Sequence, residues 1–378
     1  MPEIRKRILN LLPALRETRR ALHAMPEQAH GERETQAYLL ERLAALAPDS
    51  LEPLAGTGVK AVFRAEGSAC ATAFRADMDA LPVSEATGLP FASRNAGVMH
   101  ACGHDAHMAA SLALASLVAA HRAELKETVV FLFQPAEEGG YGARSMIEAG
   151  ALKNPAINRI YGYHVFPGMP FGALGVREGP LMARACGFDI TLKGKSAHGA
   201  SPQLGRDALV AAAQLVSMLQ TLVSRRIGPM ENAVLTIGKI AGGTRRNIIC
   251  EEVTLECTLR TFTDGAHKTM MDGVNAMRAA VEQAFEVTTQ LSMAEDYFAV
   301  VNDAALAREY RAMAGERAVE CERQCISEDF SFYQREVPGL FVFVGVGENV
   351  SALHTPAMFF DEEALLPAID MNARLLGL

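Results

Sequence analysis

The sequence has no concentrated run of lysine or arginine, and its formal net charge is −8. Proteins that bind nucleic acid usually carry a basic patch or stripe, so we expect no nucleic-acid partner. The basic residues between Arg5 and Arg20 recur in a helical pattern. We interpret them as a solvated helix face rather than a binding surface.

Long apolar segments and paired cysteines are also missing. No uninterrupted apolar stretch reaches the roughly 18 residues of a membrane span. Asn10 and Pro13 interrupt the only apolar segment near the N-terminus, which argues against a signal peptide. Seven cysteines, an odd number, are scattered along the chain and predict a reducing compartment rather than a disulfide framework. We therefore expect a cytoplasmic protein without a membrane partner.

The length of 378 residues exceeds one ordinary hydrophobic core and predicts two domains. Helical and strand-like patterns alternate over residues 1–180, which is typical of a mostly parallel sheet with helices on both faces. The predicted helices are 3–22, 31–46 and 105–121, and the predicted strands are 61–65, 71–75, 128–134 and 160–165. A further strand at 340–346 and a helix at 362–377 return to this pattern, so residues 294–378 complete the same α/β domain.

A second domain is predicted between these parts, at residues 181–293. Strands are expected at 187–194, 232–240, 248–262 and 287–293, and helices at 205–226 and 264–286. The resulting order β-α-β-β-α-β is that of a ferredoxin-like fold. We therefore expect a small α/β domain inserted into a larger one.

The densest group of chemically capable residues lies at 100–107, where three histidines, Cys102 and Asp105 occur in eight positions at the start of a predicted helix. Thiolate and imidazole are both ligands for divalent ions of borderline softness. A lone histidine here would be interpreted as polar surface. So dense a group predicts a metal site.

Other metal-capable side chains follow the predicted strands. Glu137 and Glu138 come after 128–134, Asp77 and Asp79 after 71–75, His164 lies near the end of 160–165, and His354 follows 340–346. Ligands of open α/β sheets gather beyond the carboxyl ends of the strands, so these side chains are expected to meet. Of two adjacent carboxylates, one can bind metal while the other serves as a general base.

The inserted domain offers three candidates for substrate contact. His198 lies among small residues between a strand and a helix, Asn247 follows a glycine-rich turn, and Arg260 lies in a strand and could pair with a carboxylate. For Asn247 and Arg260, an ordinary surface position is the default interpretation.

The motifs RADMDALP, HACGHDAHMA, QPAEEG, GKSAHGASP, SEDFSFY and LHTP occur in this order along nearly the whole chain. Together they resemble the aminoacylase-like branch of the carboxypeptidase G-related zinc metallopeptidases. That branch includes hippurate hydrolases, indole-acetyl-amino-acid hydrolases and N-acetyl-diaminopimelate deacetylases. The resemblance implies an α/β catalytic domain and an inserted lid and dimerisation domain. It also implies a homodimer, or a homotetramer, that acts on a small N-acyl amino acid or a dipeptide-like substrate.

The resemblance also assigns roles to residues. It implies two divalent ions per subunit, Zn, Mn, Co or Ni, bound by five ligands. These ligands would be Cys102, His104, Glu138, His164 and His354, with Cys102 as the bridge. Glu137 would be the general base and acid, while Asp79 and Asp105 would orient the ligands. His198 would reach the active site of the other subunit and donate to the oxyanion, and Asn247 and Arg260 would contact substrate.

The lid motif departs from many relatives, which carry His where this chain has Gln203, and Arg245-Arg246 before Asn247 is unusual. Both departures leave the lid contacts and the specificity open. We expect an amidohydrolase that cleaves N-acyl amino acids. The alternatives are a metallo-dipeptidase or carboxypeptidase on the same site, a cysteine amidase using Cys102 with His104 or His107, and a non-catalytic metal-binding protein.

Overall fold

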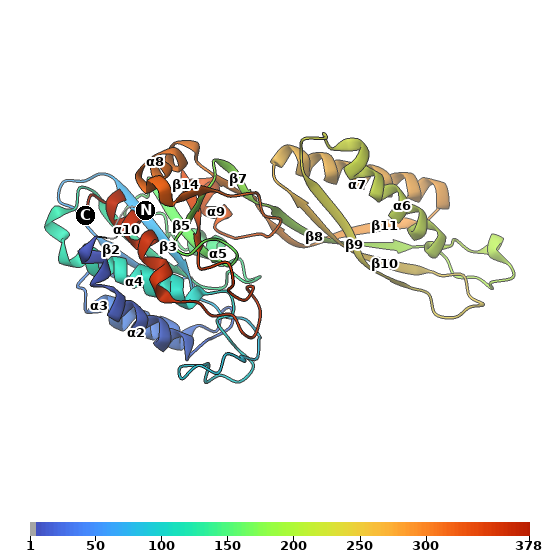
Figure 1. Cartoon of the computed structure of the whole chain (residues 1–378). Helices are drawn as coiled ribbons and strands as arrows, with labels where there is room; N and C mark the ends of the chain where they lie inside the picture. Colours follow the sequence, from blue (N-terminus) through green and yellow to red (C-terminus); the bar gives the residue numbers. More distant parts are fainter. Residues whose placement is uncertain (1–4) are drawn as a thin grey trace. The chain divides into compact units, whose positions relative to one another are not determined.

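The computed structural model describes residues 5–378, which form two compact units (Figure 1). The larger unit, called the catalytic unit after the role that the motif resemblance implies for it, contains the described chain up to Gly179, together with Val301–Glu322 and Asp329–Leu378. The inserted unit contains Pro180–Val300 and the short segment Arg323–Glu328. Strand β11 (Thr288–Tyr297) belongs to the inserted unit and runs past residue 293, where the sequence pattern predicts the boundary.

The catalytic unit is built on a mixed eight-stranded sheet with the order β1-β2-β4-β3-β5-β14-β6-β13. Its strands are β1 (Ser50–Leu54), β2 (Gly58–Phe63), β3 (Ala71–Asp77), β4 (Thr128–Gln134), β5 (Arg159–Phe166), β6 (Leu174–Val176), β13 (Ala318–Glu320) and β14 (Gly339–Gly345). The four central strands β4, β3, β5 and β14 run parallel to one another. The mostly parallel α/β architecture that the sequence predicts is therefore confirmed. Antiparallel pairs lie toward the edges, where β1 joins β2, β2 joins β4 and β14 joins β6.

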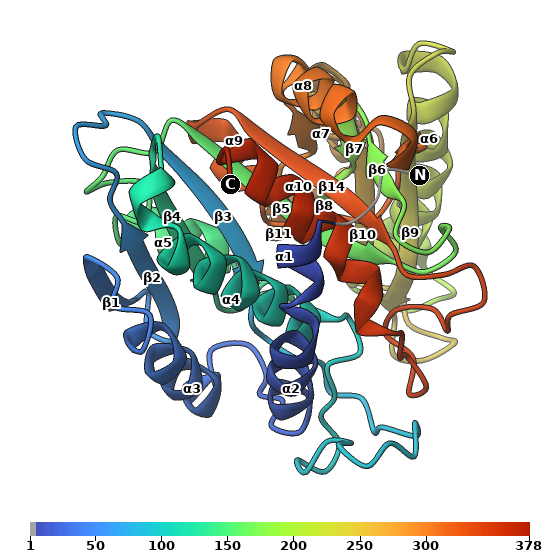
Figure 2. The same ribbon diagram turned by 60° about the vertical axis from the view of Figure 1, so that its left-hand side comes forward.

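Helices cover both faces of this sheet. They are α1 (Lys6–Leu9), α2 (Leu12–His23), α3 (Arg33–Ala44), α4 (His104–Ala120), α5 (Gly142–Glu148), α8 (Ala304–Ala314), α9 (Ser331–Glu336) and α10 (Leu366–Leu375), with 3-10 turns at Arg122–Glu124, Gly315–Arg317 and Glu362–Leu365. Figure 2 shows α4 lying along one face of the sheet beside α10. On the other face, α5 packs on β4 and α9 on β14.

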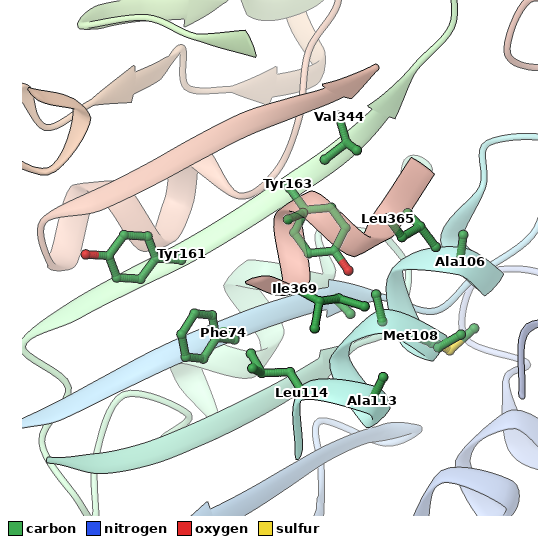
Figure 3. Packing of buried hydrophobic residues seen from close by; sticks show 14 of the residues in the cluster. Phe74, Ala106, Met108, Ala113, Leu114, Tyr161, Tyr163, Val344, Leu365 and Ile369 are labelled. Atoms are coloured by element: carbon green, nitrogen blue, oxygen red, sulfur yellow. The ribbon is translucent and has the colours of Figure 1, made fainter. Parts of the chain in front are cut away.

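Side chains alternate between the two faces along each strand. On β3, Phe74 and Ala76 belong to the core under α4, whereas Arg75 points to the other side and meets Asp329. Figure 3 shows the core under α4, with Phe74 and Tyr161 from the sheet facing Leu114 and Ile369 from the helices. Helix α4 is almost wholly buried, so its first residues are held in place by packing along its whole length.

The inserted unit has the element order β-α-β-β-α-β that the sequence predicts. The elements are β8 (Arg184–Lys193), α6 (Ala208–Arg226), β9 (Ala233–Gly242), β10 (Glu252–Thr261), α7 (Asp264–Phe285) and β11, and the antiparallel sheet has the order β11-β8-β10-β9. Its core lies between one face of this sheet and the two helices. The short strands β7 (Gly179–Met182) and β12 (Val300–Asn302) lie where the chain passes between the units.

By length and composition alone, α6 is the one helix of the described residues that could cross a membrane. A single helix of this kind is weak evidence, because core helices of soluble proteins meet the same criterion. In the present fold, the buried side of α6 supplies Ala211, Leu215 and Leu219 to the core of the inserted unit.

Candidate metal centre

The five candidate ligands come from four segments of the chain that converge at one edge of the sheet. Glu138 follows β4, His164 lies near the end of β5, and His354 lies in the long loop after β14. Cys102 and His104 lie just before and at the start of α4. Because β4, β3, β5 and β14 are parallel, their carboxyl ends share an edge, as the sequence-based argument requires.

The side chains meet around the sulfur of Cys102. Its Sγ atom lies 3.2 Å from His164 Nε2 and 3.3 Å from His354 Nε2. His354 Nε2 is in turn 3.2 Å from Glu138 Oε1. His104 has its ligand atom within 4.8 Å of those of Cys102 and His164 in one group, and of those of Glu137 and Glu138 in another. The structure thus brings together all five residues predicted as ligands.

Hydrogen bonds to the far side of each ring leave one nitrogen of His104 and of His164 facing the centre. His104 Nδ1 lies 2.8 Å from the carbonyl oxygen of Asp79, and His164 Nδ1 lies 2.7 Å from that of Val165. Donation from Nδ1 leaves a lone pair on Nε2, as in metal-bound histidines. His104 Nε2 is buried and makes no hydrogen bond, and the buried Glu138 Oε1 makes none beyond its 3.2 Å ion-pair contact with His354 Nε2. Buried polar atoms are normally satisfied, so these two, with their sulfur and nitrogen neighbours, fit a metal ion.

The shifted pKa values of Cys102 and His164 also fit a site that binds a cation. Burial raises the pKa of Cys102 well above its usual range, and Glu138 and Glu137 raise it further. A buried thiol becomes a thiolate ligand only where a metal ion displaces its proton. Burial also lowers the pKa of His164 to about 3, so its ring is neutral and able to coordinate.

His104 and Asp77 form the opposite extreme. Burial alone would lower the pKa of His104, but Asp77 and Asp79 raise it to about 10. Burial works against the charge of Asp77, whereas His104, His107 and Arg75 hold its pKa well below the usual range. The centre therefore contains buried, negatively charged carboxylates that a nearby positive charge stabilises. In the metal-free chain, protonated His104 provides that positive charge.

His107 lies in the same motif but has both ring nitrogens engaged. Nδ1 is 2.6 Å from Asp77 Oδ1, and Nε2 accepts the backbone N–H of Val165 at 3.1 Å. This histidine therefore links strands β3 and β5 and has no nitrogen left to serve Cys102 as a base. Asp105, predicted to orient the ligands, instead faces α2, where Asp105 Oδ2 lies 2.8 Å from His23 Nδ1 and 3.2 Å from Arg19 Nε.

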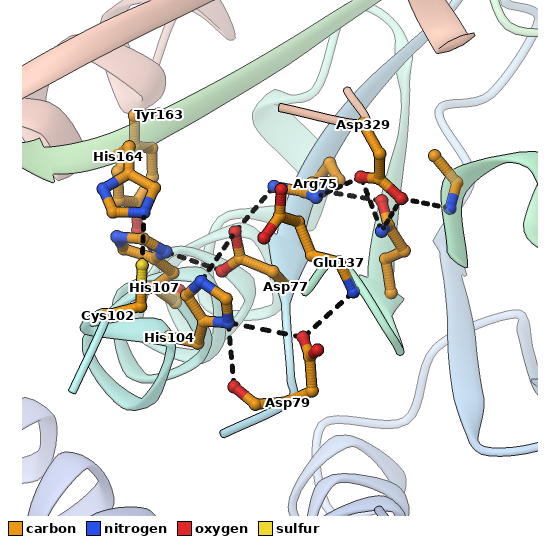
Figure 4. Close-up of polar contacts among 12 residues, drawn as sticks. Arg75, Asp77, Asp79, Cys102, His104, His107, Glu137, Tyr163, His164 and Asp329 are labelled. Carbon is orange, nitrogen blue, oxygen red and sulfur yellow. Dashed lines mark hydrogen bonds and ion pairs between the residues drawn. The ribbon is translucent and has the colours of Figure 1, made fainter. Parts of the chain in front are cut away.

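Asp79 holds the loop that carries Glu137 and Glu138. Its two carboxylate oxygens accept the backbone N–H groups of Glu137 at 3.1 Å and Glu138 at 2.9 Å, as Figure 4 shows for Glu137. The side chain of Asp79 also lies 3.4 Å from His104 Nδ1. A single buried carboxylate thereby fixes the spacing between the predicted base and two predicted ligands.

Glu32 is a second carboxylate that holds this loop, and sequence reasoning missed it. The residue is fully buried, and Glu32 Oε1 accepts the N–H of Ala136 at 2.9 Å while Oε2 accepts the hydroxyl of Thr57 at 2.6 Å. Ala136 has φ 53°, a left-handed conformation that costs energy for a residue with a side chain. No local pattern around Glu32 indicates this contact, because its partner is 104 positions away.

Beneath the ligands lies a buried network of charged and amide side chains (Figure 4). Arg75 donates to Asp77 Oδ2 at 2.7 Å, to Asp329 Oδ1 at 2.8 Å and to Gln134 Oε1 at 2.8 Å. Asp329 also accepts from Gln134 Nε2 at 2.8 Å and from the N–H of Ala143 at 2.8 Å. Asp329 and Gln134 lie in motifs that the sequence singled out, but the sequence assigned them no role. They join the ends of β3 and β4 under the centre.

The three substrate-contact candidates lie in the inserted unit. The N–H of Gly199, next to His198, donates to the carbonyl of Asn247 at 2.8 Å, so these two candidates share one corner of that unit. His198 Nδ1 accepts the N–H of Ala200 at 3.1 Å. Arg260 donates to Thr258 Oγ1 at 2.7 Å and lies 3.8 Å from Glu295. Gln203, Arg245 and Arg246 are exposed on the same unit.

Comparison with known proteins follows the same motifs. The model of peptidase family M20/M25/M40 matches residues 73–377. The chain is 38% identical over 362 residues to the N-acetyldiaminopimelate deacetylase of Halalkalibacterium halodurans. This match covers 94% of this chain and 97% of that protein. It is 39% identical over 361 residues to the N-acetylcysteine deacetylase of Bacillus subtilis, with 94% of each chain covered. The solved YXEP protein of Bacillus subtilis, a dinuclear metal binding peptidase from M20 family, has a TM-score of 0.85 at 35% identity and covers 98% of this chain and 99% of its own.

Proposed function

Because the chain belongs to peptidase family M20/M25/M40 and is a metal-dependent hydrolase of amide bonds, we propose that it removes the acyl group from N-acyl amino acids. Two relatives that resemble it over most of their length are named as deacetylases of N-acetylated amino acids.

The observation that carries the proposal is the meeting of sulfur, imidazole and carboxylate donors around Cys102. Cys102, His104, Glu138, His164 and His354 would hold two divalent ions. Mixed sulfur, nitrogen and oxygen donors are compatible with Zn, Mn, Co or Ni. A solved relative is named as dinuclear, which supports the number of ions but not their identity. When bound, two such ions supply a polarised carbonyl and a water of lowered pKa.

Glu137 is proposed as the general base. It lies next to Glu138, and its backbone is fixed by the same Asp79 carboxylate that holds the ligand. A carboxylate held beside a ligand can take a proton from the attacking water and return it to the leaving amine. A protein that only stored metal would need no such neighbour, which weighs against the non-catalytic alternative.

His198 is proposed to donate to the oxyanion of the tetrahedral intermediate from the second subunit of a homodimer. Asn247 and Arg260 are proposed to contact the substrate. These roles derive from the motif resemblance. A fully active monomer in sedimentation experiments would contradict the contribution of His198 across subunits.

The cysteine-amidase alternative is weaker in this geometry. Burial raises the pKa of Cys102, whereas a nucleophilic cysteine needs a lowered one. His107, one of its proposed partners, is engaged by Asp77 and by the backbone of Val165. A chelator separates the two mechanisms, because a cysteine amidase would keep its activity in EDTA.

The decisive experiment is a hydrolysis panel of N-acetyl amino acids, N-benzoyl amino acids and dipeptides with the metal-depleted enzyme reconstituted with Zn²⁺ or Mn²⁺. The proposal predicts turnover of at least one class of N-acyl amino acid, loss of that activity in EDTA and recovery on adding metal. Faster turnover of unblocked dipeptides would favour the dipeptidase alternative. Activity that survives complete metal removal would contradict both.

A further inference from the structure

A second group of metal-capable side chains lies inside the inserted unit. It consists of Cys186 on β8, His267 on α7 and Asp296 on β11, whose ligand atoms all lie within 4.8 Å of one another. The three residues belong to three different elements of one compact unit. None of them is part of a motif that the family resemblance uses.

The fold places these side chains together by register. Asp296 pairs directly with Cys186 across the antiparallel strands β11 and β8, and directly paired residues present their side chains on the same face. Helix α7 begins at Asp264 and packs against β11, so His267 in its first turn lies over that face. Cys186 is fully buried within the core of the unit.

The histidine of this group has an unsatisfied nitrogen. His267 Nδ1 is buried and makes no hydrogen bond. Burial lowers the pKa of His267, and Arg184 lowers it further, so the ring is neutral and has a nitrogen lone pair to offer. Leaving a buried polar atom unpaired costs free energy, and a ligand that accepts its lone pair would remove that cost.

The carboxylate of this group is already oriented. Arg184 Nε donates to Asp296 Oδ1 at 2.8 Å, and Nη2 donates to Oδ2 at 2.6 Å. Metal-binding carboxylates are commonly held by such outer hydrogen bonds. Arg184 therefore fixes the direction of the Asp296 carboxylate, whose ligand atom lies within 4.8 Å of those of Cys186 and His267.

We propose that Cys186, His267 and Asp296 bind one divalent ion of borderline softness, such as Zn²⁺, separately from the candidate metal centre. Thiolate, imidazole and carboxylate are the ligand types that zinc prefers, and three protein ligands leave one position for water. Zinc–ligand bonds of about 2.0–2.3 Å place tetrahedral ligands roughly 3.5 Å apart. Since the three ligand atoms lie within 4.8 Å of one another, the side chains need to close by no more than about 1.3 Å. The Cys186 thiol releases its proton to solvent when the metal–sulfur bond forms.

The ion would join β8, α7 and β11 at one end of the inserted unit. The chain enters that unit at residue 180, shortly before Cys186, and leaves it at residue 300, shortly after Asp296. A metal bridge at this position ties together the first and last strands of the unit. Its expected effect is structural, because binding to the folded state alone stabilises that state.

Metal content of the full-length protein tests the site. Protein loaded with ZnSO₄ and desalted is analysed for zinc per chain by mass spectrometry. Cys186→Ser and His267→Ala are each expected to bind one ion fewer than wild type. Cys257→Ser is the matched control, since it removes another buried thiol from the neighbouring strand β10 and should leave the count unchanged. An equal count in all four proteins, or a loss in the control as well, would overturn the proposal.

Cobalt spectroscopy tests the sulfur bond directly and does not depend on the count at the candidate centre. In a Cys102→Ser background loaded with Co²⁺, a thiolate-to-cobalt charge-transfer band should remain and should disappear when Cys186→Ser is added. Absence of the band in the single variant, or its persistence in the double variant, contradicts the site. Where Cys186→Ser lowers solubility, His267→Ala in the same background is used instead, because His267 lies only partly buried at the start of a helix. Loss of its imidazole should weaken or shift the band, and an unchanged band would contradict the site.

Discussion

The two units differ most in what they bury. Among the described residues, the catalytic unit buries a large set of charged side chains: Arg19, Glu32, Lys60, Arg75, Asp77, Asp79, Asp105, Asp329, Glu362 and Asp370. In the described inserted unit, the buried polar or charged residues are Thr261 and Glu328. Its ion pairs are instead mostly solvent-exposed, such as Lys193–Glu252 and Lys239–Glu256.

This difference indicates that the catalytic unit carries the free-energy cost of buried charges that a reactive site requires. Removing a charge from water costs several kcal/mol unless partners and hydrogen bonds compensate, so buried ion pairs are weak evidence for stability. Strongly perturbed ionisable groups cluster at functional sites for the same reason. The catalytic unit accepts that cost around Asp77 and His104, whereas the inserted unit has the apolar core of a scaffold.

The largest expected effect is on catalysis. Glu137→Gln keeps the shape of the side chain but removes its ability to take a proton. General acid–base catalysis typically contributes about 10²–10⁴-fold, so kcat for the best substrate of the hydrolysis panel should fall by about that factor. The metal content per chain should stay unchanged. A variant that keeps its metals and remains within tenfold of the wild-type rate would exclude Glu137 as the base.

The next effect is on stability, in the network beneath the centre. Asp329→Ala removes one of the two carboxylates that face Arg75, both of which are fully buried with it. Breaking a buried pair by removing one partner typically costs about 3–5 kcal/mol. Hydrogen exchange of the β3 and β4 amides in urea measures the loss in the free energy of unfolding of this unit. A cost below about 1 kcal/mol would mean that the network is not needed for the fold.

Acid should separate the two units. Burial lowers the pKa of His100 to about 4, so the folded metal-free chain keeps this ring neutral. The unfolded chain protonates histidine below about 6.5 and then binds more protons than the folded chain. The free energy of unfolding therefore falls as the pH drops from about 6.5 to about 4, by about 3 kcal/mol for this one group. His104 does not offset this loss, because its raised pKa of about 10 affects stability only above pH 6.5.

A buried carboxylate extends the loss to lower pH. Burial opposes the charge of Asp105, but Arg19 and His23 hold its pKa well below the usual value. Its stabilising contribution is present above about pH 3.9 and is lost as the pH falls further. Hydrogen exchange of the metal-free protein should show α4 and β3 losing protection before β8 and β10. Loss of protection in both units at the same pH would remove the contrast.

Parts of the catalytic unit could be predicted from the sequence because they are local. Strand β4 matches its predicted range of 128–134, since a strand buried on both faces reads as one continuous apolar run. The predicted helix at 3–22 is instead two helices within the described residues, α1 and α2. Pro13 lies in the first turn of α2, where its missing N–H costs nothing. Three-residue strands such as β6 and β13 leave too short a pattern to detect.

The site divides in the same way. Cys102, Glu138 and His354 could be found because they follow strands or begin a helix, and the parallel sheet brings those positions to one edge. The supporting contacts could not be found. Asp329 reaches Gln134 across 195 positions, and Glu32 reaches Ala136 across 104, so only the assembled fold reveals them. Side chains that position ligands through such contacts leave no signature of spacing in the sequence.

Glu32 tests whether this hidden support matters. Glu32→Ala frees the N–H of Ala136 and leaves the left-handed loop before Glu137 without its anchor. Changes of outer partners at metal sites typically cost 10–100-fold in metal affinity or activity. We expect the zinc dissociation constant, measured by chelator competition, to rise by a factor in this range. We expect kcat/KM to fall by a similar factor. Glu32→Gln is the matched control and should recover most of both, since its amide oxygen can accept the same N–H. Equal impairment of both variants would point to charge rather than positioning.

The smallest effect is expected in the inserted unit and completes the contrast. Glu252→Gln removes the charge of an exposed pair whose side chains are 58% and 57% accessible, with Lys193 Nζ 3.6 Å away. Water and salt screen such pairs, which typically contribute about 0–1 kcal/mol. The free energy of opening that hydrogen exchange reports for the β8 and β10 amides should therefore change by less than about 1 kcal/mol. This change should be smaller still at high salt. The pair joins two neighbouring strands, as Arg75, Asp329 and Gln134 join β3 and β4. A loss as large as that of Asp329→Ala would mean that burial is not what separates the two units.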